Sequence, residues 1–233
     1  AAGTWLFTRE RLDFRPWQAA VTAIVGTLSV TVLLVTGVVL SEPLFLALLF
    51  PTLILCERAA ERGDVRTAFL AGLLIGVLAM VRTLGVFALP GAGLVLLLRR
   101  RWGALIALGV GAMLFLVPWQ LWVGAYQGEM AHPLVGKYGS YGAWLVEGYQ
   151  AGGWDFAKAV VIRNAQDIDS TVSYMLVPVT TAWPRAIAFV SLLFFMLVGT
   201  KRYTRNAPVT AGFLACYILV VMLWPFEPNR FFL

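Results

Sequence analysis

Charged side chains are scarce in this chain of 233 residues. Only 13% of the residues are Asp, Glu, Lys or Arg and 60% are hydrophobic, whereas a soluble domain has about 25% charged and about 45–50% apolar residues. The mean hydropathy is +0.81. This composition excludes a water-soluble globular domain, and its long apolar stretches indicate an all-α membrane protein.

Cysteine and histidine are nearly absent. Cys56 and Cys216 both lie in apolar runs, which argues against a disulfide framework or a metal-binding pair and indicates packing residues. The single histidine, His132, stands in a loop that continues through Lys137 and Tyr141. The sequence identifies no Asp–His–Ser set around this one histidine, and a zinc site would rely on carboxylates. His132 is either a structural or solvent-exposed residue, or a group that binds phosphate or transfers a proton.

No motif for nucleotide or nucleic-acid binding occurs in the sequence. The glycine pairs Gly72/Gly76 and Gly109/Gly111 lie in apolar stretches with no following Gly-Lys-Ser/Thr, so they predict close helix packing. The net charge is +6 and the pI is 9.7. Because the basic residues lie at the ends of apolar stretches and not on one face among aromatic residues, we expect no nucleic-acid partner.

The basic residues fall into four clusters, which hold twelve of the 18 Lys and Arg residues. They are Arg9/Arg11/Arg15, Arg58/Arg62/Arg66, Arg99/Arg100/Arg101 and Lys201/Arg202/Arg205. The bias of cytoplasmic loops towards Lys and Arg predicts that all four lie on the cytoplasmic side. Glu42 and Arg82 then lie on the external face. So do the loop around His132 and the turn that contains Glu227 and Arg230.

This alternation predicts a polytopic transmembrane helix bundle in the plasma (inner) membrane. Seven spans result, over residues 17–40, 43–56, 68–81, 87–98, 105–123, 186–198 and 209–224. The second and fourth are short for a spanning helix, which needs about 17–25 apolar residues. The organisation is therefore about five spans in residues 1–125, an external loop over 126–184, and two further spans with an outer turn in 185–233.

The external loop is too polar and too rich in glycine to span a bilayer. It has five acidic and three basic side chains and lacks the arginine enrichment of the opposite side. Within residues 154–165, Lys158 and Arg163 lie off a stripe of apolar residues. This pattern predicts an amphipathic helix lying in the membrane interface.

Two isolated charges on the external side are candidate functional residues. Glu42, between Ser41 and Pro43, is either a solvated carboxylate in a capped turn or a functional group, since charges between apolar helices tend to mark sites. Arg82 stands alone among apolar residues. Its guanidinium either extends to the headgroups or binds a lipid phosphate through two parallel hydrogen bonds.

The end of the chain, Trp-Pro-Phe-Glu-Pro-Asn-Arg-Phe, repeats this combination of aromatic and charged residues. Two prolines make the turn rigid, and it carries Glu227 and Arg230 beside aromatic side chains. We interpret it as a binding edge. The candidate substrate-binding residues are Glu42, Arg82, His132, Lys137, Tyr141, Glu227 and Arg230.

Several short motifs together resemble a known family. They are the Ser-Glu-Pro-Leu-Phe turn at 41–45, the Ala-Gly-Leu-Leu-Ile-Gly run leading to Val-Arg at 81–82, the triple-Arg stop, the Gly-Ser-Tyr loop and the closing Trp-Pro-Phe-Glu-Pro-Asn-Arg-Phe-Phe-Leu. The chain resembles bacterial integral-membrane glycosyltransferases of the GT-C superfamily, within the group of protein mannosyltransferases and aminoarabinose transferases. The resemblance extends over essentially all 233 residues.

The resemblance implies an enzyme that transfers a sugar, with inversion, from a polyprenyl-phosphate donor to an acceptor protein or glycolipid on the external face. It assigns the donor phosphate to Arg82 and the acidic residue of the turn to Glu42, with Arg230 in the outer turn. The family's catalytic acid lies in the first external loop. We interpret this chain as an internal fragment that begins after that loop, so the catalytic residues are expected upstream.

The remaining expectations concern partners and alternatives. We expect no cofactor and no metal site among the candidate residues, and whether a divalent metal assists stays open. Membrane lipid is an expected partner. A membrane transporter or lipid flippase component is the alternative function, because glycine-rich spans and intramembrane charge occur in transporters. A purely structural scaffold would not explain Glu42 and Arg82.

Overall fold

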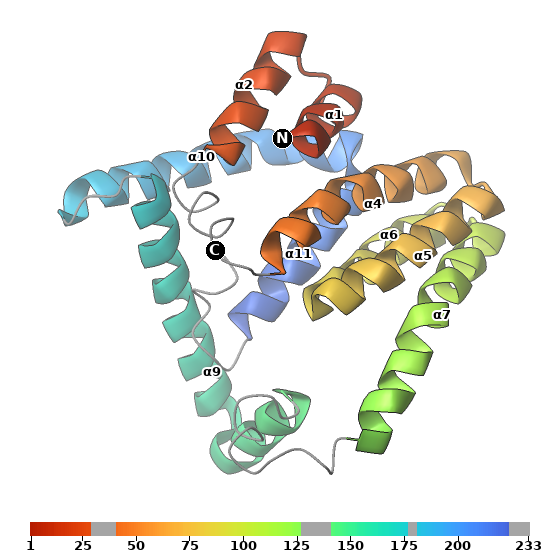
Figure 1. Cartoon of the computed structure of the whole chain (residues 1–233). Coiled ribbons are helices and arrows are strands. Elements are labelled where there is room, and N and C mark those ends of the chain that lie inside the picture. Colours follow the sequence, from red (N-terminus) through yellow and green to blue (C-terminus); the bar gives the residue numbers. More distant parts are fainter. Residues whose placement is uncertain (29–40, 127–140, 177–180, 224–233) are drawn as a thin grey trace. The chain divides into compact units, whose positions relative to one another are not determined.

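The computed structural model describes residues 1–28, 41–126, 141–176 and 181–223, and every regular element in these ranges is a helix (Figure 1). The expectation of an all-α chain is confirmed for these ranges. The helices belong to two compact units. The first is built from residues 1–117 and 190–217, and the second from residues 118–189 and 218–232.

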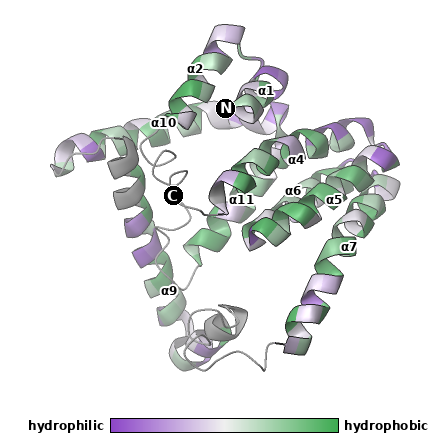
Figure 2. Ribbon diagram, in the orientation of Figure 1, coloured by the Kyte–Doolittle hydropathy of each residue, from purple (hydrophilic) through white to green (hydrophobic). Residues whose placement is uncertain are grey.

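Three helices are long and apolar enough to cross a membrane. They are α4 (Glu42–Arg62), α7 (Trp102–Tyr126) and α10 (Ala182–Asn206). Shorter apolar helices are α5 (Val65–Val81), α6 (Ala88–Leu98) and α11 (Pro208–Met222), and Figure 2 shows hydrophobic residues along most of their length. Among the described residues, three of the seven predicted spans thus lie in helices that are both long enough and apolar enough to cross a membrane. These spans are 43–56, 105–123 and 186–198. The first predicted span, 17–40, lies partly outside the described residues.

The N-terminal helices α1 (Ala2–Arg11) and α2 (Pro16–Thr27) belong to the first unit. Pro16 occupies the first helical position of α2, where its fixed φ suits the helix and no N–H is needed. The side chain of Gln18 accepts a hydrogen bond from the backbone N–H of Arg15 at 2.9 Å. Phe7 of α1 is buried and its ring lies 5.8 Å from the ring of Phe50 in α4, so α1 packs on α4.

Helices α4 and α5 form an antiparallel hairpin with a two-residue connection (Figure 1). Gly63 ends α4 with a φ of 68°, a left-handed conformation that glycine adopts without strain. Asp64 then caps α5, because its carboxylate accepts hydrogen bonds from the backbone N–H groups of Arg66 at 3.4 Å and Thr67 at 2.8 Å. These two residues fix the turn.

Glycines let the apolar helices of the first unit approach closely. A Cβ atom on Gly72 of α5 would collide with the carbonyl oxygen of Leu108 in α7. On Gly111 it would collide with the carbonyl oxygen of Phe69. The predicted close packing is confirmed at these positions, as expected where small residues lie between apolar helices. It is wrong for Gly109, around which a Cβ atom would meet nothing within 4 Å.

The structure corrects the bounds of two predicted spans. The stretch 43–56 is only part of α4, which continues to Arg62, and the charged residues Arg58 and Glu61 in this last part find partners on α1. The stretch 87–98 is an α-helix only from Ala88, and the residues before it form a short 3₁₀ helix, η1 (Thr83–Phe87). Cys56 is buried, in agreement with a packing role.

The second unit contains the whole of α9 and parts of α7, α10 and α11. Helix α9 (Tyr141–Leu176) is broken at Gly153, which has a φ of 54° and a ψ of −138°. The predicted helix 154–165 is the part of α9 that follows this break. Asn164 is fully buried, and its side-chain amide donates to the carbonyl oxygens of Val221 at 3.1 Å and Met222 at 3.0 Å. It thereby satisfies acceptors at the end of α11.

The end of α7 carries the aromatic residues expected at a membrane interface. The rings of Trp119 and Trp122 are stacked with centroids 5.3 Å apart, and the ring of Tyr126 lies 5.5 Å from that of Trp122. All three side chains are exposed, which is compatible with an interfacial belt. The positions of these rings relative to a bilayer stay a prediction.

Candidate functional site

Of the seven candidate substrate-binding residues, Arg82 is the one whose side chain the structure describes. The other six are not described at the level of side chains: His132, Lys137, Glu227 and Arg230 lie outside the described residues, and the side chains of Glu42 and Tyr141 are also outside the description. The shared site predicted for these seven residues therefore stays a prediction.

Arg82 lies where α5 ends. Its backbone is extended, with φ −146° and ψ 129°, and its N–H donates to the carbonyl oxygen of Leu78 at 3.0 Å. Its own carbonyl oxygen accepts from the N–H of Gly85 at 2.8 Å in η1. The side chain is partly exposed and acts electrostatically on the phenol of Tyr217 in α11. Arg82 is thus held by a defined turn between α5 and α6.

The antiparallel hairpin brings the backbone of Glu42 to the same end as Arg82. Glu42 is the first residue of α4, and Arg82 directly follows the last residue of α5. The opposite end of the hairpin is the turn formed by Gly63 and Asp64. Two of the predicted site residues are therefore near one another by the course of the backbone.

The four basic clusters are linked to one another at the Gly63 end of the hairpin. The guanidinium Nη2 of Arg58 lies 2.8 Å and 2.7 Å from the two carboxylate oxygens of Glu10, which precedes Arg11. This contact links the first cluster with the second.

The other two clusters contact the same region. Arg99 donates to the carbonyl oxygen of Ala60 at 2.9 Å. Arg202 donates to the carbonyl oxygen of Leu12 at 3.5 Å, and the side chain of Arg101 lies close to Gly63.

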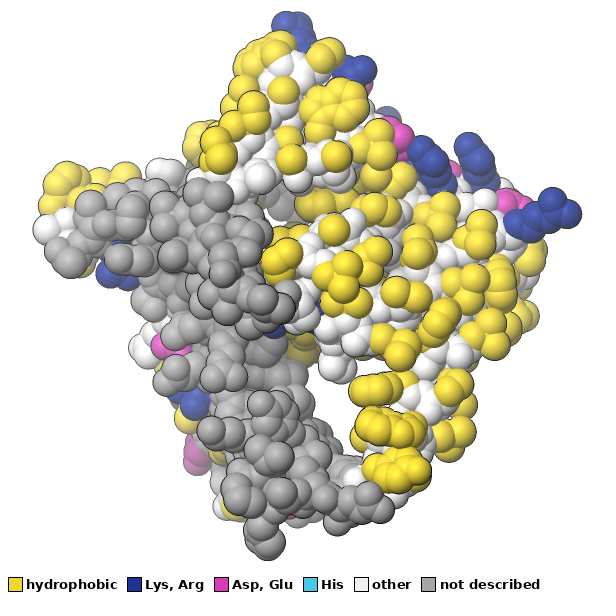
Figure 3. Space-filling view, in the orientation of Figure 1, with side chains coloured by type: hydrophobic (Ala, Val, Ile, Leu, Met, Phe, Trp, Pro, Cys, Tyr) yellow, Lys and Arg dark blue, Asp and Glu magenta, His cyan; other side chains and the backbone are white. Residues whose placement is uncertain are grey.

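These links bring together clusters that are widely separated in the sequence. In the space-filling view, hydrophobic side chains cover α4, α5 and α7, while Lys and Arg side chains gather near the helix ends (Figure 3). Arg82 lies at the other end of α5. A common end for the four clusters is what the predicted topology requires, and the side of the membrane on which this end lies stays a prediction.

Beneath the basic clusters lies a buried carboxylate, Glu57 of α4. Its side chain is fully buried, and Oε1 accepts hydrogen bonds from the backbone N–H of Thr210 at 2.8 Å and from its hydroxyl at 2.9 Å. Thr210 lies in the first turn of α11, where backbone N–H groups have no partner within the helix and where the helix dipole favours negative charge. Glu57 therefore caps α11 from a different helix.

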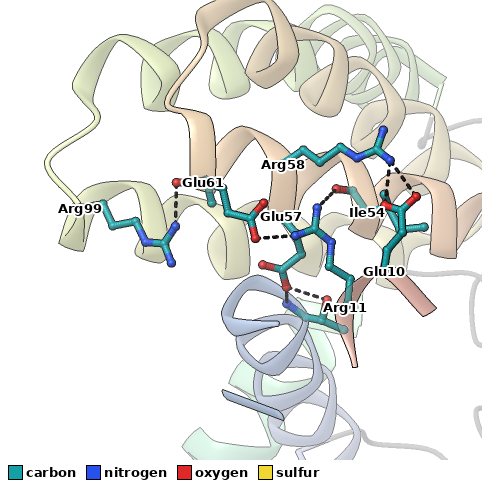
Figure 4. Close-up of polar contacts among 9 residues, drawn as sticks. Glu10, Arg11, Ile54, Glu57, Arg58, Glu61 and Arg99 are labelled. Atoms are coloured by element: carbon teal, nitrogen blue, oxygen red, sulfur yellow. Dashed lines mark hydrogen bonds and ion pairs between the residues drawn. The ribbon is translucent and has the colours of Figure 1, made fainter. Parts of the chain in front are cut away.

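Arg11 of α1 supplies the positive charge of this buried cluster. Its side chain is 6% exposed, and Nη1 lies 2.5 Å from Oε1 of Glu61, while Nη2 donates to the carbonyl oxygen of Ile54 at 3.5 Å. Figure 4 shows its guanidinium among the residues that surround Glu57. The Arg11 charge also acts on the carboxylate of Glu57. A buried charge is tolerated when it is paired and hydrogen-bonded, and Nη1 and Nη2 of Arg11 and Oε1 of Glu57 have such partners.

The Arg11–Glu57 cluster positions helices, and it has the features of a structural network. Nε of Arg11 and Oε2 of Glu57 are buried without a hydrogen-bond partner among the described residues. The same residues contain no group of three His, Cys, Asp or Glu side chains that could hold a metal ion. Glu57 is sealed from solvent, so a substrate would have no access to it. The cluster joins α1, α4 and α11.

The sequence patterns predicted neither Glu57 nor Arg11 as members of a buried cluster. They place Arg11 in a basic cluster and end the second span at residue 56, directly before Glu57. A signal was present, because Glu57 directly follows the apolar run Leu53–Cys56 and an ionisable residue at such a position demands a partner. The partner, Thr210, lies 153 residues away, and no local pattern reveals it.

Comparisons with known proteins identify no relative of this chain. No protein-family model matches it, and neither does any curated protein or solved structure.

Proposed function

We propose that this chain is part of a membrane glycosyltransferase that moves a sugar from a polyprenyl-phosphate donor to an acceptor protein or glycolipid on the external face. The observation that carries the proposal is the location of Arg82. It is a partly exposed guanidinium at the end of α5 opposite the linked basic clusters, on an apolar helix. The motifs that resemble GT-C glycosyltransferases support the same function.

Arg82 has the chemistry that the donor requires. A guanidinium forms two parallel charge-assisted hydrogen bonds with phosphate oxygens. When the sugar leaves, negative charge develops on the lipid phosphate, and a fixed cation in a partly dehydrated site stabilises that charge. The turn from α5 into η1 holds the Arg82 backbone through hydrogen bonds with Leu78 and Gly85. The polyprenyl tail would remain in the bilayer beside the apolar helices.

The other candidate residues complete the proposed site. Glu42 would lie near Arg82, since the antiparallel hairpin brings the two backbones to one end. His132, Lys137 and Tyr141 would contribute from the external loop. Glu227 and Arg230 would contribute from the outer turn. The protein is proposed to be a multi-pass protein of the inner membrane.

Binding of polyprenyl phosphate to the purified protein tests the role of Arg82. We expect Arg82→Ala to weaken binding by about tenfold or more, since hydrogen bonds to charged groups contribute about 1.5–3 kcal/mol. Binding of the uncharged polyprenol should change little. Arg62→Ala, which removes an exposed guanidinium from the opposite end of the hairpin, is the matched control. Equal affinities in wild type and a folded Arg82→Ala variant would rule out Arg82 as the phosphate ligand.

A transporter or lipid flippase component is the second candidate. The observation in its favour is the buried Arg11–Glu57 cluster, because ionisable groups enclosed within apolar helices occur on transport pathways. This function predicts that substitution of Glu57 alters flux of a lipid or ion across proteoliposomes. The glycosyltransferase proposal predicts instead that the protein transfers a sugar in a reaction that depends on Arg82. It predicts no flux of a lipid or ion.

A further inference from the structure

An apolar cavity lies at the end of the first unit where the basic clusters meet. It has a volume of about 330 Å³, within the range of about 300–1,000 Å³ that is typical of ligand sites. The cavity lies between the turn that follows α1 and the C-terminal half of α10. Its apolar lining is Leu12, Phe14, Phe195, Met196 and Leu214.

Helix α10 presents exposed apolar side chains at this cavity. None of its residues is buried, and Phe195 is 68% and Met196 45% exposed. Exposed apolar surface of this extent marks a site for lipid or for a protein partner. Gly199 also lines the cavity, and a Cβ atom on it would meet nothing within 4 Å, so the absence of a side chain there keeps the cavity open.

Positive charge borders the same cavity. Arg202 lines it, and its hydrogen bond of 3.5 Å with the carbonyl oxygen of Leu12 ties the head of the side chain to the turn after α1. The neighbouring Lys201 and Arg205 are exposed. Asp13, between the lining residues Leu12 and Phe14, is the one carboxylate in this turn, so the three cations Lys201, Arg202 and Arg205 outnumber it. An apolar cavity with a cationic rim is complementary to a molecule with an apolar chain and an anionic head.

We propose that this cavity binds an anionic phospholipid of the cytoplasmic leaflet, with one acyl chain between α10 and the turn after α1 and with the headgroup phosphate on Arg202. The phenol of Tyr203, which also lines the cavity, is a hydrogen-bond donor for a phosphate or ester oxygen, whereas the hydroxyl of Thr200 donates to the carbonyl oxygen of Met196 at 2.6 Å. The charge of the rim selects the occupant, because anionic lipids are attracted by juxtamembrane Lys and Arg. This lipid is distinct from the proposed donor at Arg82, which lies at the other end of α5.

Native mass spectrometry of the detergent-purified protein tests the proposal, with phosphatidylglycerol and phosphatidylcholine of identical acyl chains as probes. We expect one phosphatidylglycerol to bind more tightly than phosphatidylcholine. Arg202→Gln should weaken the binding of phosphatidylglycerol by about fivefold, which corresponds to about 1 kcal/mol. The binding of phosphatidylcholine should not change. Gly199→Leu should weaken the binding of both lipids, because the leucine side chain would fill the space of the acyl chain.

Matched controls separate this site from a general effect of charge or of side-chain size. Arg62→Gln removes an exposed arginine that does not line the cavity, and Gly109→Leu adds a side chain at a helical glycine with open space. Neither should change lipid affinity. The proposal is overturned if Arg62→Gln weakens phosphatidylglycerol as much as Arg202→Gln, or if wild type binds neither lipid. A dimer that Gly199→Leu dissociates would also overturn it, because a second copy would then fill the cavity.

Discussion

Glu57 and Thr210 are joined by two hydrogen bonds in the buried part of the first unit. The carboxylate oxygen Oε1 accepts from the backbone N–H at 2.8 Å and from the hydroxyl at 2.9 Å. The first bond provides an acceptor for the N-terminus of α11, and the second orients the carboxylate. This contact explains how a carboxylate is accommodated beside apolar helices: the start of one helix supplies the donors that solvent would otherwise supply.

The first prediction concerns the strength of this contact. Glu57→Ala should lower the free energy of unfolding by about 2–3 kcal/mol, because it removes an acceptor for buried donors and leaves Arg11 with less compensating charge. Thr210→Ala should have a smaller effect, since the backbone N–H remains. Denaturant unfolding in detergent micelles measures both, and the double variant should show a coupling energy between the two side chains.

Thr204 provides the control for that cycle. It is an exposed threonine of α10 whose hydroxyl donates to the carbonyl oxygen of Thr200 in its own helix at 2.9 Å. Glu57→Ala and Thr204→Ala should therefore be additive. If the Glu57/Thr210 pair is equally additive, the two side chains do not stabilise each other and the capping interpretation is wrong.

The second prediction concerns two glycines in apolar helices. Gly72→Ala should destabilise the protein by about 1–3 kcal/mol, the usual cost of overpacking, because its Cβ would collide with the carbonyl oxygen of Leu108. Gly109→Ala should be neutral or stabilising, since its Cβ meets nothing within 4 Å and alanine favours the helix. Thermal unfolding of the two variants side by side measures the difference. Equal stability would mean that α5 and α7 are not in close contact at Gly72.

The third prediction concerns the pH dependence of the α5 cap. Hydrogen bonds from the side chain and backbone of Thr67 lower the pKa of Asp64 below its ordinary value of 3.8. A carboxyl group with a lower pKa in the folded state contributes stability above its unfolded pKa, and this contribution is lost as the pH falls through the folded pKa. Below about pH 3.8, wild type should thus lose stability that Asp64→Asn does not lose.

Asparagine is the suitable replacement for this experiment because it still caps a helix but does not titrate. Stability of wild type and Asp64→Asn should be measured by denaturant unfolding from pH 7 downwards. The difference between the two should decrease once the carboxyl group of wild type is protonated. A difference that is constant over the whole range would show that Asp64 is not coupled to folding.

The sequence patterns predicted helices better than they predicted polar contacts. The apolar stretches 43–56 and 68–81 predict parts of α4 and α5, whereas the turn at Gly63 and Asp64 is seen only in the structure. The predicted helix 154–165 begins directly after the break at Gly153, but the helical residues 141–152 and 166–176 of α9 are not predicted, because they lack a clear stripe of apolar residues. The Glu57–Thr210 contact was missed because it depends on how α4 and α11 pack, and the packing of distant helices leaves no local pattern.

The candidate site, which the sequence analysis assigns to the external side, is predicted to a lesser extent. The sequence identified Arg82 as an isolated cation, and the structure places it in a defined turn. The antiparallel hairpin also brings Glu42 to the same end. The contribution of the external loop depends on long-range contacts of residues that no periodic pattern constrains.

The fourth prediction concerns topology. A cysteine introduced at Gly139 should react with a membrane-impermeant maleimide added to intact cells, and one at Arg100 should react only after the membrane is permeabilised. The reason is that Arg100 lies in a basic cluster and residues 126–184 form the predicted external loop. The background should lack Cys56 and Cys216. Labelling of Arg100→Cys in intact cells, with Gly139→Cys unlabelled, would invert the proposed topology.

The last prediction concerns the distance between Glu42 and Arg82, on which a shared donor site depends. Helix α4 has 21 residues and α5 has 17, so α4 extends about 6 Å beyond α5 at the end opposite the Gly63 turn. With adjacent helix axes about 8–10 Å apart, the two residues should be about 10–12 Å from one another, within reach of one sugar phosphate.

A short bismaleimide should therefore cross-link Glu42→Cys with Arg82→Cys in a protein that lacks Cys56 and Cys216. The pair Glu42→Cys and Arg66→Cys, at opposite ends of the hairpin, should not cross-link. Glu42→Gln should lower sugar transfer while membrane insertion is retained, because the charge is removed without loss of side-chain size. Efficient cross-linking of the control pair, or none in either pair, would separate Glu42 from the proposed site and leave it as a residue of the helix start.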